Sequence, residues 1–86
     1  MAQATVYSKS WCPYCVRAKL LLRQLGVDFD DLDVERDPAL LAEMVERSGR
    51  HTVPQIWIGA THVGGCDDLY ALHRAGKLAA LLQETQ

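Results

Sequence analysis

The first half of the chain alternates twice between a short β-prone run and a helical pattern, and this alternation restricts the fold most. Residues 4–8 ("ATVYS") and 27–34 ("VDFDDLDV") are rich in β-branched and aromatic residues, as buried strands are. Apolar residues recur at helical spacing after each run, over residues 13–25 and 38–48. A strand that returns parallel to its predecessor through a helix does so with a right-handed crossover. We therefore predict a sheet with helices packed on both faces.

The second half of the chain predicts a hairpin followed by helices. Residues 55–58 and 61–63 are β-prone runs separated by Gly59-Ala60, which fits a tight antiparallel turn. A helix is expected with Asp67 and Asp68 in its first turn, where acids complement the helix dipole, and Gly76 ends it before a short last helix around Leu78. The predicted order is β-α-β-α-β-β-α-α, an α/β protein with a small mixed sheet.

The second β-prone run leaves its register open. Phe29 has the opposite parity to Leu32 and Val34, so the three apolar side chains cannot all point to one face of a regular strand.

Length and composition indicate a single domain over residues 1–86. The hydrophobic fraction of 49% is ordinary for a globular protein, and no apolar stretch approaches the roughly 18 residues of a membrane span. The first ten residues lack the basic and apolar regions of a signal peptide. The net charge of -2 argues against a nucleic-acid partner. We expect a cytoplasmic protein with neither a membrane nor a nucleic acid as partner.

The sequence "WCPYC" lies between the first strand and the first helix. A C-x-x-C motif beside a β-α-β pattern in a cytosolic protein is typical of a thioredoxin-like redox site. The spacing puts Cys12 and Cys15 on one face, and Pro13 suits the first helical position. Free N–H groups at the helix start favour a thiolate on Cys12, and Lys9, in a first segment that has no acids, acts in the same direction.

Two other interpretations of the cysteines are weaker. Packing alone explains poorly why two cysteines should flank a first-turn proline. A zinc site needs four ligands, and the chain offers only Cys66 with His51, His62 and His73, none at the usual ligand spacing. We therefore expect no metal, and we expect the three histidines to be surface or capping residues.

Two further motifs remain ambiguous from the residues alone. Pro54 opens a strand, so it must lie at an edge or mark a turn, and Val53-Pro54 has only the ordinary ~5% frequency of a cis bond. Gly64-Gly65 precedes a helix start whose N–H groups could receive a carboxylate. A loop with capping acids explains that segment at least as well.

Together, "YSKSWCPYC", "TVPQIWI" and "GGCDDLYAL" resemble the glutaredoxin family, most closely its short bacterial dithiol type, over nearly the whole chain. The resemblance implies a thioredoxin-like fold with a four-stranded mixed sheet flanked by helices. It also implies a monomer without a tightly bound cofactor, which uses glutathione as co-substrate and acts on disulfide-bonded or glutathionylated proteins.

The resemblance also implies roles for individual residues. Cys12 would be the exposed nucleophile and Cys15 the buried resolving thiol. A cis Pro54 would leave the Val53 backbone to pair with the cysteine moiety of glutathione. The other implied glutathione-binding residues are Lys9 near the glycyl carboxylate, Tyr14 in the groove, Thr52 beside the Val53 backbone, and Gly65, Cys66, Asp67 and Asp68 at the γ-glutamyl end.

One position departs from the family pattern. Many relatives place a glutamine near the glycyl carboxylate where this chain has Leu41, so that contact stays unassigned, with Arg50 as a weak substitute.

The sequence therefore predicts a glutathione-dependent thiol-disulfide oxidoreductase that reduces protein disulfides and glutathione mixed disulfides. Two alternatives remain open: a redoxin fed by thioredoxin reductase, and an iron-sulfur cluster carrier that uses Cys12 and bound glutathione. The proline of "CPYC" resembles the catalytic members more than the carriers.

Overall fold

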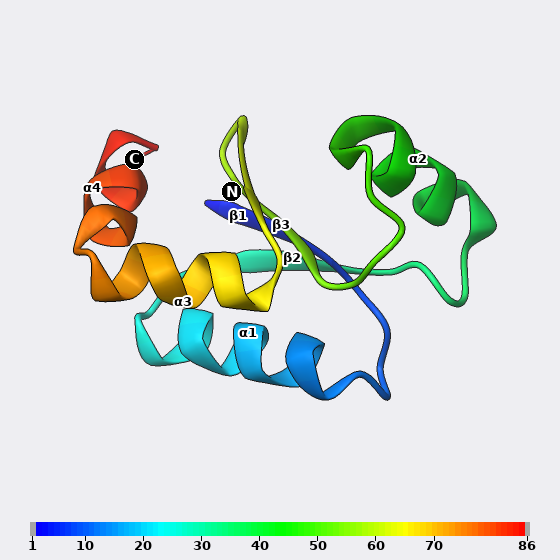
Figure 1. The fold of residues 1–86 in the computed structure, drawn as a ribbon, viewed down its shortest axis with the longest axis horizontal. Helices are drawn as coiled ribbons and strands as arrows, with labels where there is room; N and C mark the ends of the chain where they lie inside the picture. The colour runs from blue at the N-terminus through cyan, green and yellow to red at the C-terminus, as the bar shows by residue number, and fades with distance from the viewer. Residues whose placement is uncertain (1, 86) are drawn as a thin grey trace.

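The computed structural model describes residues 2–85, and its elements follow the predicted order (Figure 1). They are β1 (Ala4–Ser8), α1 (Pro13–Gln24), β2 (Phe29–Asp33), α2 (Pro38–Ser48), β3 (Gln55–Ile58), β4 (Thr61–Gly64), α3 (Cys66–Arg74) and α4 (Lys77–Glu84). Within residues 2–85, none of these helices has the length and apolar character that a bilayer crossing requires.

The four strands form one mixed sheet in the order β2-β1-β3-β4. β1 pairs parallel with β2, while β3 pairs antiparallel with both β1 and β4. The parallel pair is joined through α1, and β3 and β4 form the predicted hairpin around Gly59-Ala60. The predicted thioredoxin-like arrangement is confirmed.

Helices cover both faces of the sheet because alternate residues of the central strands point to opposite sides. Val6 and Ile56 pack in a core with residues of α1, α3 and α4, whereas Tyr7 and Trp57 pack with Met44 of α2. Figure 1 shows α1 beside α3 on one side of the sheet and α2 on the other. Both central strands are therefore buried on both faces, as their nearly continuous apolar sequences predict.

The two-faced core also explains the mixed parity of β2. Phe29 packs with the α1 and α3 side, while Leu32 and Val34 pack with the α2 side. The opposite parity of these apolar residues is therefore compatible with a regular strand, because each face of the sheet packs against a hydrophobic core.

Local capping residues set the helix ends as expected. Cys12 caps α1 with Pro13 in its first turn, and the Asp37 carboxylate accepts a 3.0 Å hydrogen bond from the Ala39 N–H at the start of α2. Gly49 ends α2 with φ of 70°, a left-handed conformation that favours glycine.

Candidate functional site

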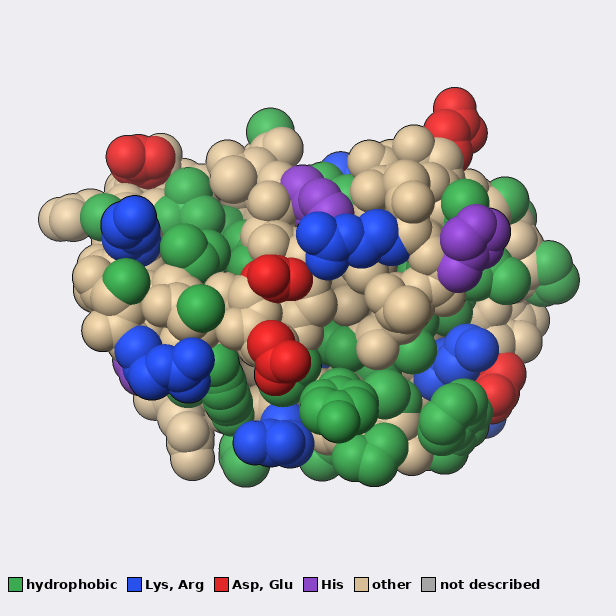
Figure 2. All heavy atoms as spheres, in the orientation of Figure 1, with side chains coloured by type: hydrophobic (Ala, Val, Ile, Leu, Met, Phe, Trp, Pro, Cys, Tyr) green, Lys and Arg blue, Asp and Glu red, His purple; other side chains and the backbone are tan. Residues whose placement is uncertain are grey.

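A groove of about 300 Å³ runs between the start of α1, the loop before β3 and the start of α3. It is lined by Tyr14, Thr52, Val53, Pro54, Gly65, Cys66, Asp67 and Asp68. Figure 2 shows acidic and basic side chains mixed across one face of the molecule, with hydrophobic side chains gathered at its lower edge. Neither charge sign dominates this face, which suits a ligand with charges of both signs better than a polyanion.

Cys12 lies at the N-cap of α1, where the helix presents its unpaired N–H groups. Its Sγ accepts a hydrogen bond from the Cys15 N–H at 3.4 Å, a contact that favours the thiolate. The same sulfur lies 3.9 Å from the Val53 carbonyl oxygen, so Cys12 is next to the groove. The expectation that Cys12 is exposed is wrong: only 5% of its surface is accessible, because the Val53 loop packs against it.

Cys15 lies one helical turn further along α1 and is fully buried. Burial raises the pKa of its thiol to about 12, and the neighbouring Cys12 sulfur adds to this. A backbone hydrogen bond from Lys9 and the charge of Lys19 lower the pKa but do not offset the burial. Both cysteines are free and not disulfide-bonded. Cys15 is the less accessible of the two to a substrate, because it is fully buried while 5% of the Cys12 surface is exposed.

All of the predicted glutathione-binding residues line the groove except Lys9. The Lys9 ammonium lies 5.6 Å from the centre of the Trp11 ring. The Val53–Pro54 peptide bond is cis, as the resemblance implied.

Asp68 organises the end of the groove at the start of α3. Its carboxylate accepts a 2.8 Å hydrogen bond from the Gly65 N–H and pairs with Arg50 at 3.3 Å. Gly64 has φ of 116°, and a Cβ there would overlap the Asp68 carboxylate, so a glycine is required. Arg50 thus contacts Asp68 at the end of the groove that the resemblance assigns to the γ-glutamyl group.

Cys66 lies in the first turn of α3 and is 5% exposed. Burial raises the pKa of its thiol, with the charge of Arg17 acting in the opposite direction. A raised thiol pKa lowers the thiolate fraction at neutral pH, so Cys66 is less reactive than an ordinary exposed thiol.

The histidines differ from the expectation of surface or capping roles at one position. His62 is half-buried on β4, stacks on Trp57 with ring centres 4.5 Å apart, and has its Nε2 at 2.8 Å from the Gln55 Oε1. His51 and His73 are exposed. Among residues 2–85, no three His, Cys, Asp or Glu side chains are grouped so that they could hold a metal ion.

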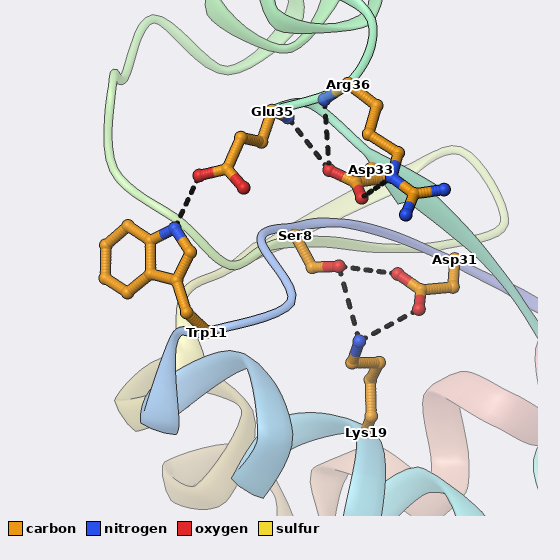
Figure 3. Close-up of polar contacts among 7 residues, drawn as sticks. All are labelled: Ser8, Trp11, Lys19, Asp31, Asp33, Glu35 and Arg36. Carbon is orange, nitrogen blue, oxygen red and sulfur yellow. Dashed lines mark hydrogen bonds and ion pairs between the residues drawn. The ribbon is translucent and has the colours of Figure 1, made fainter.

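A polar network formed by Lys19, Ser8 and Asp31 was not predicted from the sequence (Figure 3). Lys19, only 9% exposed, pairs with Asp31 at 2.8 Å and donates to Ser8 Oγ at 3.4 Å, and the Ser8 hydroxyl donates to Asp31 at 2.5 Å. Burial alone would raise the pKa of the Asp31 carboxyl, but the hydrogen bonds from Lys19 and Ser8 outweigh it and the pKa is lowered. The sequence feature that could have indicated this network is the position of Lys19, four residues after Cys15 and therefore on the same, buried face of α1.

A second contact in Figure 3 fixes the loop that carries the cysteine motif. The Trp11 indole N–H donates to Glu35 at 2.5 Å, and Glu35 is held in turn by a 2.9 Å hydrogen bond from its backbone N–H to Asp33. The loop before α1 is thereby tied to the end of β2.

We expect removal of the two partners of this ion pair to have unequal effects on stability. Asp31→Ala leaves the Lys19 charge buried beside one hydroxyl, and should lower the free energy of unfolding by about 2 kcal/mol, below the ~3–5 kcal/mol of fully buried pairs because Asp31 is partly exposed. Lys19→Met should cost less, since Asp31 can still reach water. Urea unfolding at pH 7 measures both.

The matched control is the double variant Lys19→Met with Asp31→Ala, which should recover much of the loss. Because the pKa of Asp31 is lowered on folding, the stabilisation is present above about pH 4, the usual unfolded value, and is lost as pH falls through the folded pKa. The difference between wild type and Asp31→Ala should therefore shrink toward pH 2. Equal losses in both single variants at all pH values would contradict the buried-charge explanation.

Comparison with known proteins agrees with this geometry. The glutaredoxin family model matches residues 4–63. Glutaredoxin from Pseudomonas aeruginosa is 58% identical over 82 residues, covering 95% of this chain and 98% of the relative. Glutaredoxin 3 from Escherichia coli is 54% identical over 83 residues, covering 96% of this chain and 100% of the relative.

Solved structures give the same result. The solution structure of glutaredoxin from Brucella melitensis superposes with a TM-score of 0.85 at 53% identity, covering 100% of this chain and 94% of that one. The crystal structure of a buckwheat glutaredoxin-glutathione complex superposes with a TM-score of 0.89 at 37% identity, covering 98% of this chain and 79% of that one.

Proposed function

This chain belongs to the glutaredoxin family of glutathione-dependent thiol-disulfide oxidoreductases, and we propose that Cys12 and Cys15 perform this reaction beside a glutathione-binding groove. The observation that carries the proposal is the position of Cys12: its sulfur lies at a helix N-cap and contacts the Val53 loop that borders the groove. A disulfide bound in that groove would meet this sulfur first, because Cys15 is fully buried.

The first step is an attack by the Cys12 thiolate on the glutathione sulfur of a mixed disulfide. A bond forms between Cys12 Sγ and the glutathione sulfur, the original disulfide bond breaks, and the substrate leaves as a thiolate that takes a proton from water. The Cys15 N–H, which points at Cys12 Sγ, supports the thiolate before the attack.

Two routes return the enzyme to the dithiol state. In one, the thiolate of a second glutathione attacks the glutathione bound to Cys12, which produces glutathione disulfide and restores the Cys12 thiolate. In the other, Cys15 attacks Cys12 Sγ in a mixed disulfide with a protein, which releases the reduced protein and forms a Cys12-Cys15 bridge. Two glutathione molecules then reduce that bridge.

The groove suits glutathione by charge. Glutathione carries a carboxylate at each end and an ammonium group at the γ-glutamyl end. Each carboxylate needs N–H groups or a cation as partner, and the ammonium group needs an acid. The start of α3 offers backbone N–H groups together with Asp67 and Asp68, and Arg50 lies beside them. We assign the γ-glutamyl end to this site. We assign the glycyl carboxylate to Lys9, whose ammonium lies 5.6 Å from the centre of the Trp11 ring.

A coupled assay tests the electron donor. With a glutathione mixed disulfide as substrate, we expect turnover with glutathione, glutathione reductase and NADPH, and none when thioredoxin reductase and NADPH replace the glutathione system. Efficient reduction by thioredoxin reductase without any glutathione would overturn the proposal in favour of a redoxin fed by that flavoprotein.

The acid at the groove can be tested without disturbing the fold. Asp67 is exposed and lines the groove, whereas Asp68 also caps α3. Asp67→Asn should raise the Michaelis constant for glutathione several-fold, on the scale of about 1 kcal/mol for a partly exposed charged contact. The effect should decrease in high salt because exposed pairs are screened.

Asp30→Asn is the matched control, because it removes one exposed carboxylate from β2 at the opposite edge of the sheet. It should leave the Michaelis constant unchanged. Equal effects of Asp67→Asn and Asp30→Asn would mean that only the net charge matters and would remove Asp67 from the site.

The partners that follow from this reaction are glutathione and glutathionylated or disulfide-bonded proteins. We propose that the protein works as a monomer in a reducing compartment such as the cytoplasm, where glutathione keeps thiols reduced.

A further inference from the structure

A buried amide holds the backbone segment that borders Cys12. Gln55, the first residue of β3, is fully buried, and its side-chain NH₂ donates to the Thr52 carbonyl at 3.0 Å and to the Thr52 hydroxyl at 3.2 Å. A carbonyl oxygen can only accept, so the NH₂ group must face Thr52 and the amide oxygen must face the other way.

The amide oxygen of Gln55 is fixed by His62 on the neighbouring strand. The His62 Nε2 lies 2.8 Å from this oxygen, so Nε2 must carry a proton and donate. Burial lowers the pKa of His62, with the charges of Arg50 and Arg47 acting in the same direction and that of Asp68 against it. His62 is therefore neutral at pH 7 in the tautomer with the proton on Nε2, and its stack on Trp57 fixes the ring.

The segment that Gln55 holds is fixed by side-chain contacts: Val53 packs against the core on the α2 side of the sheet, and Gln55 holds Thr52. Residues 49–54 contain neither helix nor strand, and Thr52 is exposed. Val53, the next residue, presents its carbonyl to Cys12 Sγ at 3.9 Å and lines the groove. The two hydrogen bonds from Gln55 thus fix the orientation of the peptide unit that joins Thr52 to Val53, because the Thr52 carbonyl belongs to that unit.

We propose that Gln55 is a positioning residue for glutathione recognition: it holds the Thr52–Val53 peptide in the orientation that pairs with the cysteinyl part of a glutathione disulfide, and His62 holds Gln55. This inference rests on the proposed glutathione groove. Gln55 does not touch the sulfur atoms, so it acts on binding of the glutathione part and not on the attack by Cys12. A ligand that lacks the glutathione backbone gains nothing from it.

Two variants remove the interaction in different ways. Gln55→Met keeps the length of the side chain and removes both hydrogen-bonding groups. Gln55→Glu keeps an acceptor for His62 but cannot donate to the Thr52 carbonyl. Both should raise the Michaelis constant for a glutathione mixed disulfide about three- to tenfold, the effect of about one ordinary hydrogen bond, with kcat nearly unchanged. His62→Phe keeps the stack on Trp57 and should have a smaller effect, since both bonds to Thr52 remain.

Two controls separate positioning from loss of stability. Ile58→Val, at the other end of β3, destabilises the core modestly and should not change the Michaelis constant. Stoichiometric reaction of the reduced enzyme with bis(2-hydroxyethyl) disulfide, without glutathione, should keep its wild-type rate in both Gln55 variants. The residual dipolar coupling of the Val53 N–H, measured by NMR, reports the orientation of this peptide unit, and it should change in Gln55→Met and stay unchanged in Ile58→Val.

The outcomes distinguish this inference from the proposed function. A wild-type enzyme that does not prefer the glutathione mixed disulfide over the small neutral disulfide would overturn both. A preference that persists in Gln55→Met and Gln55→Glu, with an unchanged Val53 N–H coupling, would overturn the positioning role alone.

Discussion

Replacing Cys12 by serine should abolish reduction of both glutathione mixed disulfides and protein disulfides. A serine hydroxyl does not ionise near neutral pH, and the Cys15 sulfur is fully buried and cannot replace Cys12 in the first attack. The loss in kcat should be at least about 1,000-fold, in the range found when a catalytic nucleophile is removed. The coupled assay with glutathione reductase and NADPH measures it.

Cys15→Ser is the matched variant, because it changes the other cysteine of the same motif. Glutathione can still release a glutathione bound to Cys12, so this variant should keep most of its activity on glutathione mixed disulfides. Reduction of a protein disulfide that depends on the Cys12-Cys15 bridge should be strongly impaired. Equal loss of mixed-disulfide reduction in the two variants would mean that Cys15 is needed in every cycle, and the route without the bridge would be wrong.

Cys66→Ser separates the third thiol from the other two. Cys66 is buried in the groove wall with a raised thiol pKa, so this variant should retain both activities. If Cys12→Ser is inactive and Cys66→Ser is active, the position at the α1 N-cap determines reactivity. A thiol elsewhere in the groove wall is then not sufficient.

The order of elements could be predicted because its signals are local. Pro13, Asp37 and Gly49 mark helix ends through their own backbone preferences and capping bonds, and these hold whatever the chain packs against. The register of β2 could not be predicted, because the opposite parity of Phe29 and Leu32 makes sense only when both faces of the sheet are covered.

The polar contacts between distant residues were not accessible from the sequence. Lys19 meets Asp31 only because β1 pairs in parallel with β2 and α1 packs across them, and no pattern within either segment reveals that pairing. Gln55 lies next to Pro54 in the motif "TVPQIWI", but its role depends on His62 across the β3-β4 hairpin.

The degree of exposure of Cys12 was also beyond the sequence. The motif places this residue at a helix start, where side chains are usually accessible. The loop that covers it, through the contact with Val53, comes from a part of the chain 41 residues away. The tertiary contact with Val53 therefore determines how accessible Cys12 is to a substrate, whereas the motif indicates only that Cys12 is a redox-active cysteine.

The bridge-forming step should show an unusually alkaline pH dependence. Burial raises the pKa of Cys15 to about 12, and this contribution persists when Cys12 is in a mixed disulfide, although the contribution from the Cys12 sulfur changes. A raised thiol pKa means that the attacking thiolate becomes more abundant as pH rises toward that pKa. The rate at which Cys15 displaces glutathione from Cys12 should therefore increase about tenfold from pH 8.5 to 9.5, where a thiol with the ordinary pKa of about 8.5 would gain less than about twofold.

The step can be measured by forming the Cys12-glutathione mixed disulfide, transferring it to buffers between pH 6 and 9.5, and quantifying released glutathione by acid quench and mass spectrometry. Cys15→Ser supplies the background, because no intramolecular attack is possible in it. Lys19→Met should slow the step further at each pH. The Lys19 charge lowers the pKa of Cys15, so its removal should raise that pKa further and reduce the thiolate fraction. A rate that levels off near pH 8.5 would show that Cys15 ionises as an ordinary thiol once Cys12 is occupied. The ionisation of Cys15 would then be determined by opening of the active-site loop to water and not by its burial.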